Sequence, residues 1–257
     1  MWQALRDELH PLGVEIVTVS LELSGPEASR PFIEAASPQH PSLLDPTHQL
    51  DSLFGVVNIP NVIWIDEDGV IVRPPEPGWP GTTVYPESMR TLLAERARQA
   101  AENPAPADAP ARPNLMRILG GGQDRAAYPD AIRDWARNGA ASQYVMTPDE
   151  VVAASQPRPM SASEGAAHFE LANHFWRTGD RGAAVHHFNE CHRLQPDNWT
   201  YKRQAWSLVG NERAGGGELG RFSQIPVPGE EADWPFASNF DADIAQLEPG
   251  QYYPNTM

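Results

Sequence analysis

The sequence predicts an α/β domain followed by a helical domain, and three observations lead to this division. A β-branched, apolar run over residues 14–21 is typical of a strand that is buried on both faces. Residues 62–72 contain two further apolar runs separated by an Asp-Glu-Asp-Gly turn, which indicates a strand hairpin. Beyond a stretch dense in proline and alanine at residues 101–113, the apolar spacing becomes helical.

The first domain, residues 1–98, is predicted in the order helix, strand, helix, strand, helix, strand, strand. Residues 1–9 carry apolar side chains at helical spacing, and the His-Pro-Leu-Gly stretch at 10–13 ends that helix. Asp45 or Thr47 is placed to cap the third helix, and Gly69 can take the positive φ that a hairpin turn requires. The order predicts an α/β layer architecture with a mixed sheet. The remaining elements are expected at residues 14–21, 26–36, 42–45, 47–54, 62–65 and 70–72.

An extended linker at residues 99–113 is expected to lead into a helical domain over residues 114–209. Thr147, Pro148 and Glu150 form the pattern of a helix start with a capping box. Further helices are expected at residues 128–137, 163–177, 180–194 and 198–209. Residues 210–257 are irregular but rich in aromatic side chains, so we expect a strap that lies along the body. Its aromatic residues are Phe222, Trp234, Phe236, Phe240, Tyr252 and Tyr253.

Charge and apolar patterning exclude several classes of partner. The net charge is −15, and an acidic surface repels phosphate backbones and anionic lipid, so neither nucleic acid nor a membrane surface is expected as a partner. No apolar run approaches the roughly 20 residues that span a bilayer, and the first nine residues lack the apolar core of a signal peptide. The single cysteine, Cys191, allows no intrachain disulfide. A cytoplasmic location is expected, with an upstream signal or anchor left open if the start is truncated.

The pattern of residues 13–74 resembles the thioredoxin-like superfamily. The residues that carry the resemblance are the apolar run at 14–21, Leu44-Asp45, Phe54-Gly-Val, Ile59-Pro60 and the stretch Ile65-Asp-Glu-Asp-Gly-Val-Ile71. The chain is most similar to TlpA/ResA-type thiol-disulfide oxidoreductases and peroxiredoxins. The resemblance implies that Pro60 is a cis-proline, an uncommon form of the peptide bond. A cis-proline loop exposes backbone groups that can pair with an extended segment, so Ile59, Pro60 and Asn61 are the predicted binding residues.

The departure from the family pattern is as informative as the match. The family carries a Cys-x-x-Cys pair at the start of its first long helix, where the helix N-terminus lowers a thiol pKa. This chain begins inside the place of that helix, so the resemblance implies an oxidoreductase-type protein whose redox centre is missing from the chain. Either the redox motif lies upstream of a misassigned start, or the protein is a redox-dead relative. We favour the first explanation, because a sheet without its central strand leaves unpaired edges.

A second resemblance covers residues 163–196, which look like one tetratricopeptide repeat. The matching residues are His168, Leu171, Ala172, Phe175, Gly179, Ala184, Phe188, Cys191 and Pro196. Such a unit needs neighbouring helices to bury its faces. The alternative function is therefore a non-catalytic adaptor that binds a protein or peptide through this helical module.

Other candidate chemistry has a simpler structural interpretation. Cys191 occupies a position that a repeat fills with a small buried residue, so we expect core packing. His187 and Cys191, four apart on a helix, with His168 or His192 nearby, could form a zinc-site fragment, but no second cysteine or histidine-rich motif completes it.

Polar and aromatic pairs in the rest of the chain have similar alternatives. Asp66 and Asp68 fit a hairpin turn better than a pair of catalytic carboxylates. Ser20 and Ser24 lack the setting of a nucleophile elbow. The helical spacing of Trp199, Tyr201 and Trp206 favours core packing over ligand stacking. We therefore predict no catalytic residue, no metal site and no cofactor in this chain.

Overall fold

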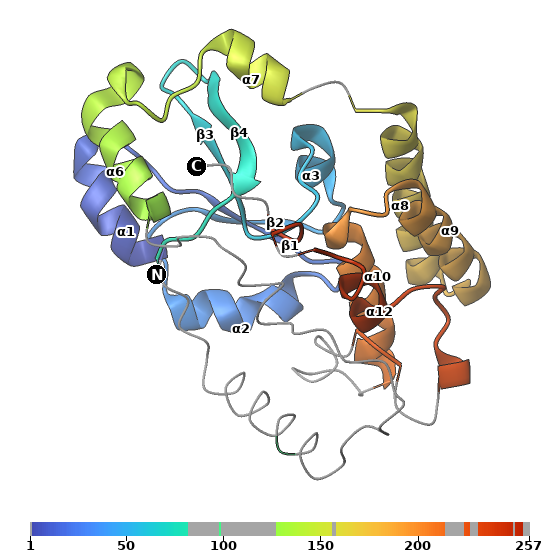
Figure 1. Cartoon of the computed structure of the whole chain (residues 1–257). Coiled ribbons are helices and arrows are strands. Elements are labelled where there is room, and N and C mark those ends of the chain that lie inside the picture. Colours follow the sequence, from blue (N-terminus) through green and yellow to red (C-terminus); the bar gives the residue numbers. More distant parts are fainter. Residues whose placement is uncertain are drawn as a thin grey trace.

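The structure is a computed structural model that describes residues 2–81, 98, 127–155, 158–213, 224–226, 231–248 and 250–253. The predicted linker at 99–113 and Phe222 of the predicted strap lie outside the described residues. Figure 1 shows α1 and α6 side by side at one side of the molecule and the α8–α9 pair at the opposite side, with α3 and α10 between them.

The first 81 residues form helices and strands in the predicted order. The helix predicted at 26–36 and the strand predicted at 42–45 have the observed bounds, because glycine and proline mark their ends. Gly25 (φ 85°) precedes the first, and Ser37 ends it in the left-handed region. Only the last four residues of the apolar run at 14–21 are a strand. The elements are α1 (Trp2–Leu9), η1 (His10–Leu12), β1 (Thr18–Leu21), α2 (Pro26–Ala36), β2 (Ser42–Asp45), α3 (Gln49–Phe54), β3 (Asn61–Ile65) and β4 (Ile71–Pro77).

The four strands form two separate two-stranded sheets, which corrects the expectation of one mixed sheet. β1 pairs with β2 in parallel, from Thr18 opposite Ser42 to Leu21 opposite Asp45. β3 pairs with β4 antiparallel through the Asp66–Gly69 turn, as predicted, with register irregularities around Trp64. Within the described residues, no strand lies between β1 and β3 to join the two pairs by hydrogen bonds.

The later part of the chain is helical. The helix with the predicted capping box begins at Pro148, as expected, whereas the helix predicted at 163–177 begins three residues earlier, at Met160. The Thr147 hydroxyl accepts a hydrogen bond from the Glu150 amide, and the Glu150 carboxylate accepts one from the Thr147 amide, so the predicted capping box is present. The α8–α9 hairpin turns at Gly179 (φ 90°). The elements are α6 (Ala127–Asn138), η2 (Gly139–Ala141), α7 (Pro148–Ala154), α8 (Met160–Thr178), α9 (Arg181–Leu194), α10 (Trp199–Arg213), η3 (Glu231–Asp233) and α12 (Phe240–Ile244).

Two hydrophobic cores organise these elements, and their boundary does not follow the expected domain boundary. The first core contains Leu5, Leu9 and Trp64 together with Tyr128 and Ile132 of α6. The Trp64 indole donates a hydrogen bond to the Tyr128 hydroxyl over 2.9 Å. Helix α6, expected in the helical domain, therefore belongs to the core of the α/β part.

The second core lies among α8, α9 and α10 and receives the aromatic residues of the predicted strap. Phe169, Phe188 and Trp206 are its largest fully buried side chains from these helices. The later aromatic residues in this cluster are Trp234, Phe236, Phe240, Tyr252 and Tyr253. These described parts of residues 210–257 thus lie against the body, as the aromatic content predicts.

Helix α10 connects the second core to the strands of the first part. The side-chain amide of Gln204 donates to the carbonyl of Leu21 at the end of β1, and its oxygen accepts from the Leu23 amide. The Thr200 amide donates to the carbonyl of Val57, just before the β3 strand. These hydrogen bonds hold α10 against the end of β1 and the segment that precedes β3.

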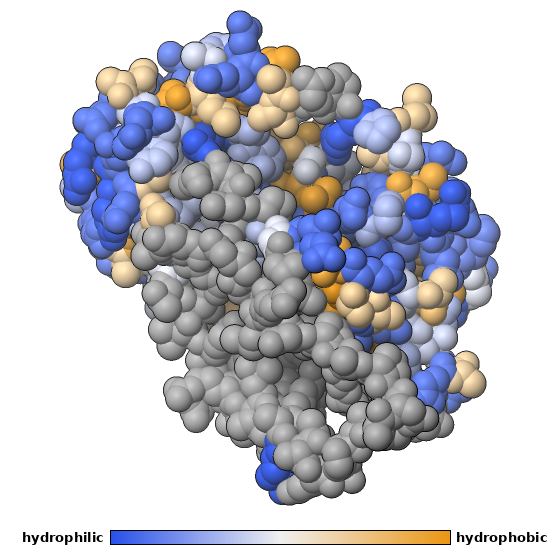
Figure 2. All heavy atoms as spheres, viewed as in Figure 1, coloured by the Kyte–Doolittle hydropathy of each residue, from blue (hydrophilic) through white to orange (hydrophobic). Residues whose placement is uncertain are grey.

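The described surface is mostly hydrophilic over the outer faces of α1, α6, α8 and α9, as Figure 2 shows. This arrangement agrees with the amphipathic patterns that predicted these helices. Among the described residues, no helix is both long and apolar enough to cross a membrane.

Candidate functional site

The predicted binding residues lie in the loop that leads into β3, here called the Ile59 loop (residues 58–61). The Ile59–Pro60 peptide bond is cis, as predicted. The side-chain oxygen of Asn58 accepts a hydrogen bond from the Ile59 amide over 2.9 Å, and this contact fixes the approach to Pro60. The Ile59 side chain is exposed, whereas Pro60 and Asn61 are half-buried.

The main-chain and side-chain groups of this loop are engaged by a segment from far along the chain. We call residues 250–253 the tyrosine segment. The Tyr253 hydroxyl donates to the Ile59 carbonyl over 2.9 Å, and the side-chain amide of Asn58 donates to the Tyr252 carbonyl over 2.8 Å. The sequence analysis predicted that this loop pairs with an extended segment, but nothing in the sequence indicated which segment reaches it.

The Ile59 side chain also lines a cavity of about 360 Å³, here called the Ile59 pocket. The pocket lies between α10 on one side and β1 with α2 on the other. Its lining is mixed, because apolar side chains alternate with hydroxyl, amide and charged groups. The residues that line it include Ser20, Phe32, Ile33, Ile59, Arg203 and Gln204.

Arg203 joins the Ile59 pocket to the tyrosine segment. Its guanidinium donates to the Tyr252 hydroxyl over 3.1 Å and to the side-chain oxygen of Gln224 over 3.1 Å. On the opposite wall, the hydroxyls of Ser20 and Ser29 lie 2.8 Å apart. The pocket and the tyrosine segment therefore form one continuous site around Ile59, with a cation near its middle.

Asn61, the third predicted residue, lies in β3 opposite Pro77 of β4. Its side-chain oxygen is buried and makes no hydrogen bond to any described residue. Buried polar atoms are usually paired.

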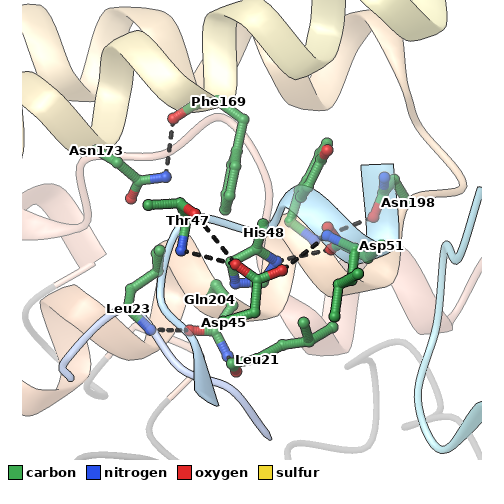
Figure 3. Close-up of polar contacts among 12 residues, drawn as sticks. Leu21, Leu23, Asp45, Thr47, His48, Asp51, Phe169, Asn173, Asn198 and Gln204 are labelled. Atoms are coloured by element: carbon green, nitrogen blue, oxygen red, sulfur yellow. Dashed lines mark hydrogen bonds and ion pairs between the residues drawn. The ribbon is translucent and has the colours of Figure 1, made fainter. Parts of the chain in front are cut away.

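A buried His–Asp pair lies close to this site and was not anticipated by the sequence analysis. His48 Nδ1 and Asp51 Oδ2 are 2.7 Å apart, and both side chains are fully buried. His48 has a left-handed backbone (φ 57°) and packs its ring against Phe169 of α8 and Tyr201 of α10. Figure 3 shows His48 and Asp51 pointing toward one another between α3 and these two helices. The pair therefore joins the first part of the chain to the second core.

The carboxylate of Asp45 holds the start of α3 and so positions this pair. It accepts hydrogen bonds from the amide and hydroxyl of Thr47 and from the Leu50 amide, the last at 2.7 Å. Figure 3 shows the contacts between Asp45 and Thr47 beside His48. The N-cap residue itself is His48, so neither predicted residue occupies that position, but the Asp45 carboxylate satisfies the Leu50 amide in the first turn of the helix.

The His48–Asp51 pair predicts a pH dependence of stability. Burial raises the pKa of Asp51, with His48 opposing the shift. Between the unfolded value of about 3.9 and the raised folded value, the folded state holds more protons, so its stability falls as pH rises through that window. We expect the difference in free energy of unfolding between wild type and Asp51→Asn to fall from pH 4 upward, as measured by urea unfolding.

The exposed Asp68→Asn variant is the control for this measurement, because Asp68 lies on the hairpin turn away from the pair. The difference in free energy of unfolding between wild type and Asp68→Asn should not fall over this pH range. A wild-type advantage over Asp51→Asn that grows between pH 4 and 5.5 would contradict the assignment.

The cysteine and histidines of the helical hairpin do not converge on a metal centre. Cys191 is fully buried in the second core, where packing was expected. His168 and His187 instead approach each other across α8 and α9, with 2.8 Å between their Nδ1 atoms, and His192 is buried against Trp206. Among the described residues, no group of three histidine, cysteine or acidic side chains could hold a metal ion.

Cys191 should behave as a packing residue with an unreactive thiol. Burial raises the pKa of the Cys191 thiol above its ordinary value, and the thiolate is the reactive form. We expect the native protein to be inert to Ellman's reagent and to react fully after unfolding in urea. Cys191→Ala should cost roughly 1 kcal/mol from lost packing. Rapid labelling of the native thiol would contradict this interpretation.

The remaining candidates have the structural roles that the sequence analysis favoured. The Asp66 carboxylate accepts hydrogen bonds from the amides of Asp68 and Val70, which closes the hairpin turn. Trp199, Tyr201 and Trp206 are core residues. Ser24 donates its amide to Glu22, and neither Ser20 nor Ser24 is hydrogen-bonded to a histidine in the described contacts.

No protein-family model matches the chain, and no curated protein and no solved structure matches it.

Proposed function

We propose that this chain is a thioredoxin-like, non-catalytic binding protein in which the Ile59 loop and the Ile59 pocket receive an extended segment of a partner protein. The proposal keeps the resemblance to the thiol-disulfide oxidoreductase type and assigns this chain the recognition of a polypeptide. The strand hairpin that follows Ile59-Pro60 supports the resemblance.

The observation that carries the proposal is the contact between the Ile59 loop and the tyrosine segment. An irregular stretch of polypeptide already lies against the loop, with hydrogen bonds to the Ile59 carbonyl and from the Asn58 amide. Recognition of extended peptides elsewhere uses main-chain hydrogen bonds for affinity and neighbouring pockets for specificity. In this chain the Ile59 loop supplies the hydrogen bonds, and the Ile59 pocket supplies the specificity.

Thiol chemistry within this chain is disfavoured by its single cysteine. A dithiol centre needs two thiols, and Cys191 is the only cysteine in the sequence and is buried. The chain as given should therefore not reduce insulin disulfides. Turnover that persists in Cys191→Ser would have to be assigned to some other group.

The helical part supports the adaptor role by forming one wall of the site. The α8–α9 hairpin buries small residues, Ala172 and Ala184, at the contact between its helices, as a tetratricopeptide-like unit does. Helix α10 packs on this hairpin and presents Arg203 and Gln204 to the Ile59 pocket. In this proposal the repeat-like unit positions α10, and α10 contacts the partner.

The test is selection of peptides from a phage-displayed random library against the full chain, followed by binding measurements on the variant Ile59→Glu. We expect the selected peptides to lose at least tenfold in affinity when a charge replaces Ile59. Ile65→Glu is the matched control, because Ile65 is an isoleucine of similar exposure (45% against 39%) at the far end of β3, the strand that follows the loop. The proposal fails if no selected peptide depends on Ile59, or if both variants weaken binding equally.

A further inference from the structure

The tyrosine segment places two adjacent aromatic side chains in two different environments beside the Ile59 loop. The Tyr252 ring packs edge-on against Trp199 with 4.8 Å between centroids, and the Tyr253 ring packs edge-on against Trp79 at 5.1 Å. Both tryptophans are almost completely buried. Edge-to-face contacts of this kind add to the free energy of burying an aromatic ring.

The hydroxyl group of each tyrosine forms a hydrogen bond within the site. The Tyr252 hydroxyl accepts a hydrogen bond from the Arg203 guanidinium, whereas the Tyr253 hydroxyl donates to the Ile59 carbonyl. A ring without a hydroxyl would remove one of the hydrogen bonds of Arg203 and the hydrogen bond that the Ile59 carbonyl accepts from Tyr253. The two positions therefore favour tyrosine over phenylalanine or an aliphatic side chain.

The main chain between these rings is held by one sequence-independent contact. Asn58 donates its side-chain amide to the Tyr252 carbonyl, and it is itself buried and oriented by the Ile59 amide. Any residue offers the same carbonyl, so the rings carry the selectivity and Asn58 sets the register of the bound segment.

The tyrosine segment has the character of an exchangeable occupant. Its described residues form turns and bends and no helix or strand. The turn is closed locally, because the Gln251 amide donates to the Glu248 carbonyl and the Gln251 side chain accepts from the Glu248 amide. Opening the segment would withdraw the Tyr252 ring, which is 2% exposed, from the second core, so that ring largely sets the free energy of opening.

We propose that the tyrosine segment is an intramolecular competitor, and that the partner segment received by the Ile59 loop carries two adjacent tyrosines. This inference rests on the proposed function, since it names the chemistry of the same partner. The chain then binds a Tyr-Tyr segment in trans only when its own segment has left the loop. Its apparent affinity for the partner is reduced by the fraction of molecules in which the loop is occupied.

The test uses a fluorescent synthetic peptide with the sequence of residues 246–257 and the full-length chain, with binding followed by fluorescence anisotropy. Tyr253→Phe in the protein removes the hydroxyl that donates to Ile59 but leaves the ring. We expect this variant to bind the peptide about two- to tenfold more tightly than wild type, which corresponds to the loss of one net hydrogen bond from the competitor. Tyr144→Phe, a half-buried tyrosine of the first core, should bind as wild type does.

One further measurement keeps the test decisive. A peptide with alanine at both tyrosine positions should not bind. The inference is overturned if Tyr253→Phe leaves the affinity unchanged or if the alanine peptide binds equally well. The proposed function is judged separately, because Ile59-dependent peptides without adjacent tyrosines would support it while refuting this inference.

Discussion

Replacing Glu76 with alanine is expected to destabilise the protein by about 3–5 kcal/mol, because it removes a buried carboxylate that pairs with the buried Arg73 guanidinium. Arg73 and Glu76 form a bidentate pair in β4, with N–O distances of 2.6 and 2.7 Å, and both side chains are more than nine-tenths buried. Arg73 also donates to the Tyr144 carbonyl and lies over the Trp64 ring. Urea unfolding monitored by circular dichroism measures the loss.

Two controls separate the buried pair from charge in general. Arg73→Met combined with Glu76→Leu removes both charges and should recover most of the lost stability, since well-packed apolar residues can replace a buried ion pair at little cost. Glu27→Ala breaks the exposed pair with Arg30 and should leave the free energy of unfolding nearly unchanged. A double variant as unstable as Glu76→Ala would show that the site needs the ion pair itself.

Trp64→Ala is expected to cost about 3–5 kcal/mol, through lost burial and the cavity that remains. Trp64 is 2% exposed, stacks on Trp135 with 5.0 Å between ring centroids, and packs edge-on against Tyr128. Its removal also leaves the Tyr128 hydroxyl without the indole donor. The midpoint of urea unfolding should fall accordingly.

The neighbouring residue provides the control for this substitution. Ile65 follows Trp64 on β3 and points to the exposed side, so Ile65→Ala should change the free energy of unfolding by less than about 1 kcal/mol. Equal losses for the two variants would mean that the core does not centre on Trp64.

Local signals in the sequence predicted the helices and strands well. The Thr147 capping box, the proline at position 26 and the glycine at 179 depend on contacts within a few residues, so they can be recognised without knowing the fold. The hairpin between β3 and β4 was predicted for the same reason, because Asp66 and Gly69 close the turn locally.

Long-range pairing could not be predicted in the same way. The apolar run at 14–21 indicates burial but does not identify the neighbouring strand, and β1 pairs only with β2 among the described strands. The amphipathic pattern of α6 likewise indicates an apolar face without saying that Trp64 and Leu9 cover it.

The candidate site shows the same limit. The Ile59-Pro60 dipeptide identified the loop, because its local pattern is distinctive. The His48–Asp51 pair stayed undetected because its environment is completed by Phe169 and Tyr201, more than a hundred residues later. The tyrosine segment reaches Ile59 from position 253, and no spacing rule connects the two.

The discontinuous first core has a consequence for the order of events during synthesis on the ribosome. Leu5, Leu9 and Trp64 are made early, yet their packing partners Tyr128 and Ile132 are translated only after the whole proline- and alanine-rich stretch. The apolar surface around Trp64 therefore stays uncovered while that stretch is being made. The Ile59 loop lacks its partners for longer still, because Tyr252 and Tyr253 are translated almost two hundred residues after it. A nascent chain would thus present an open Ile59 loop throughout most of its translation, and the molecule would close that loop on itself only as a late step of folding.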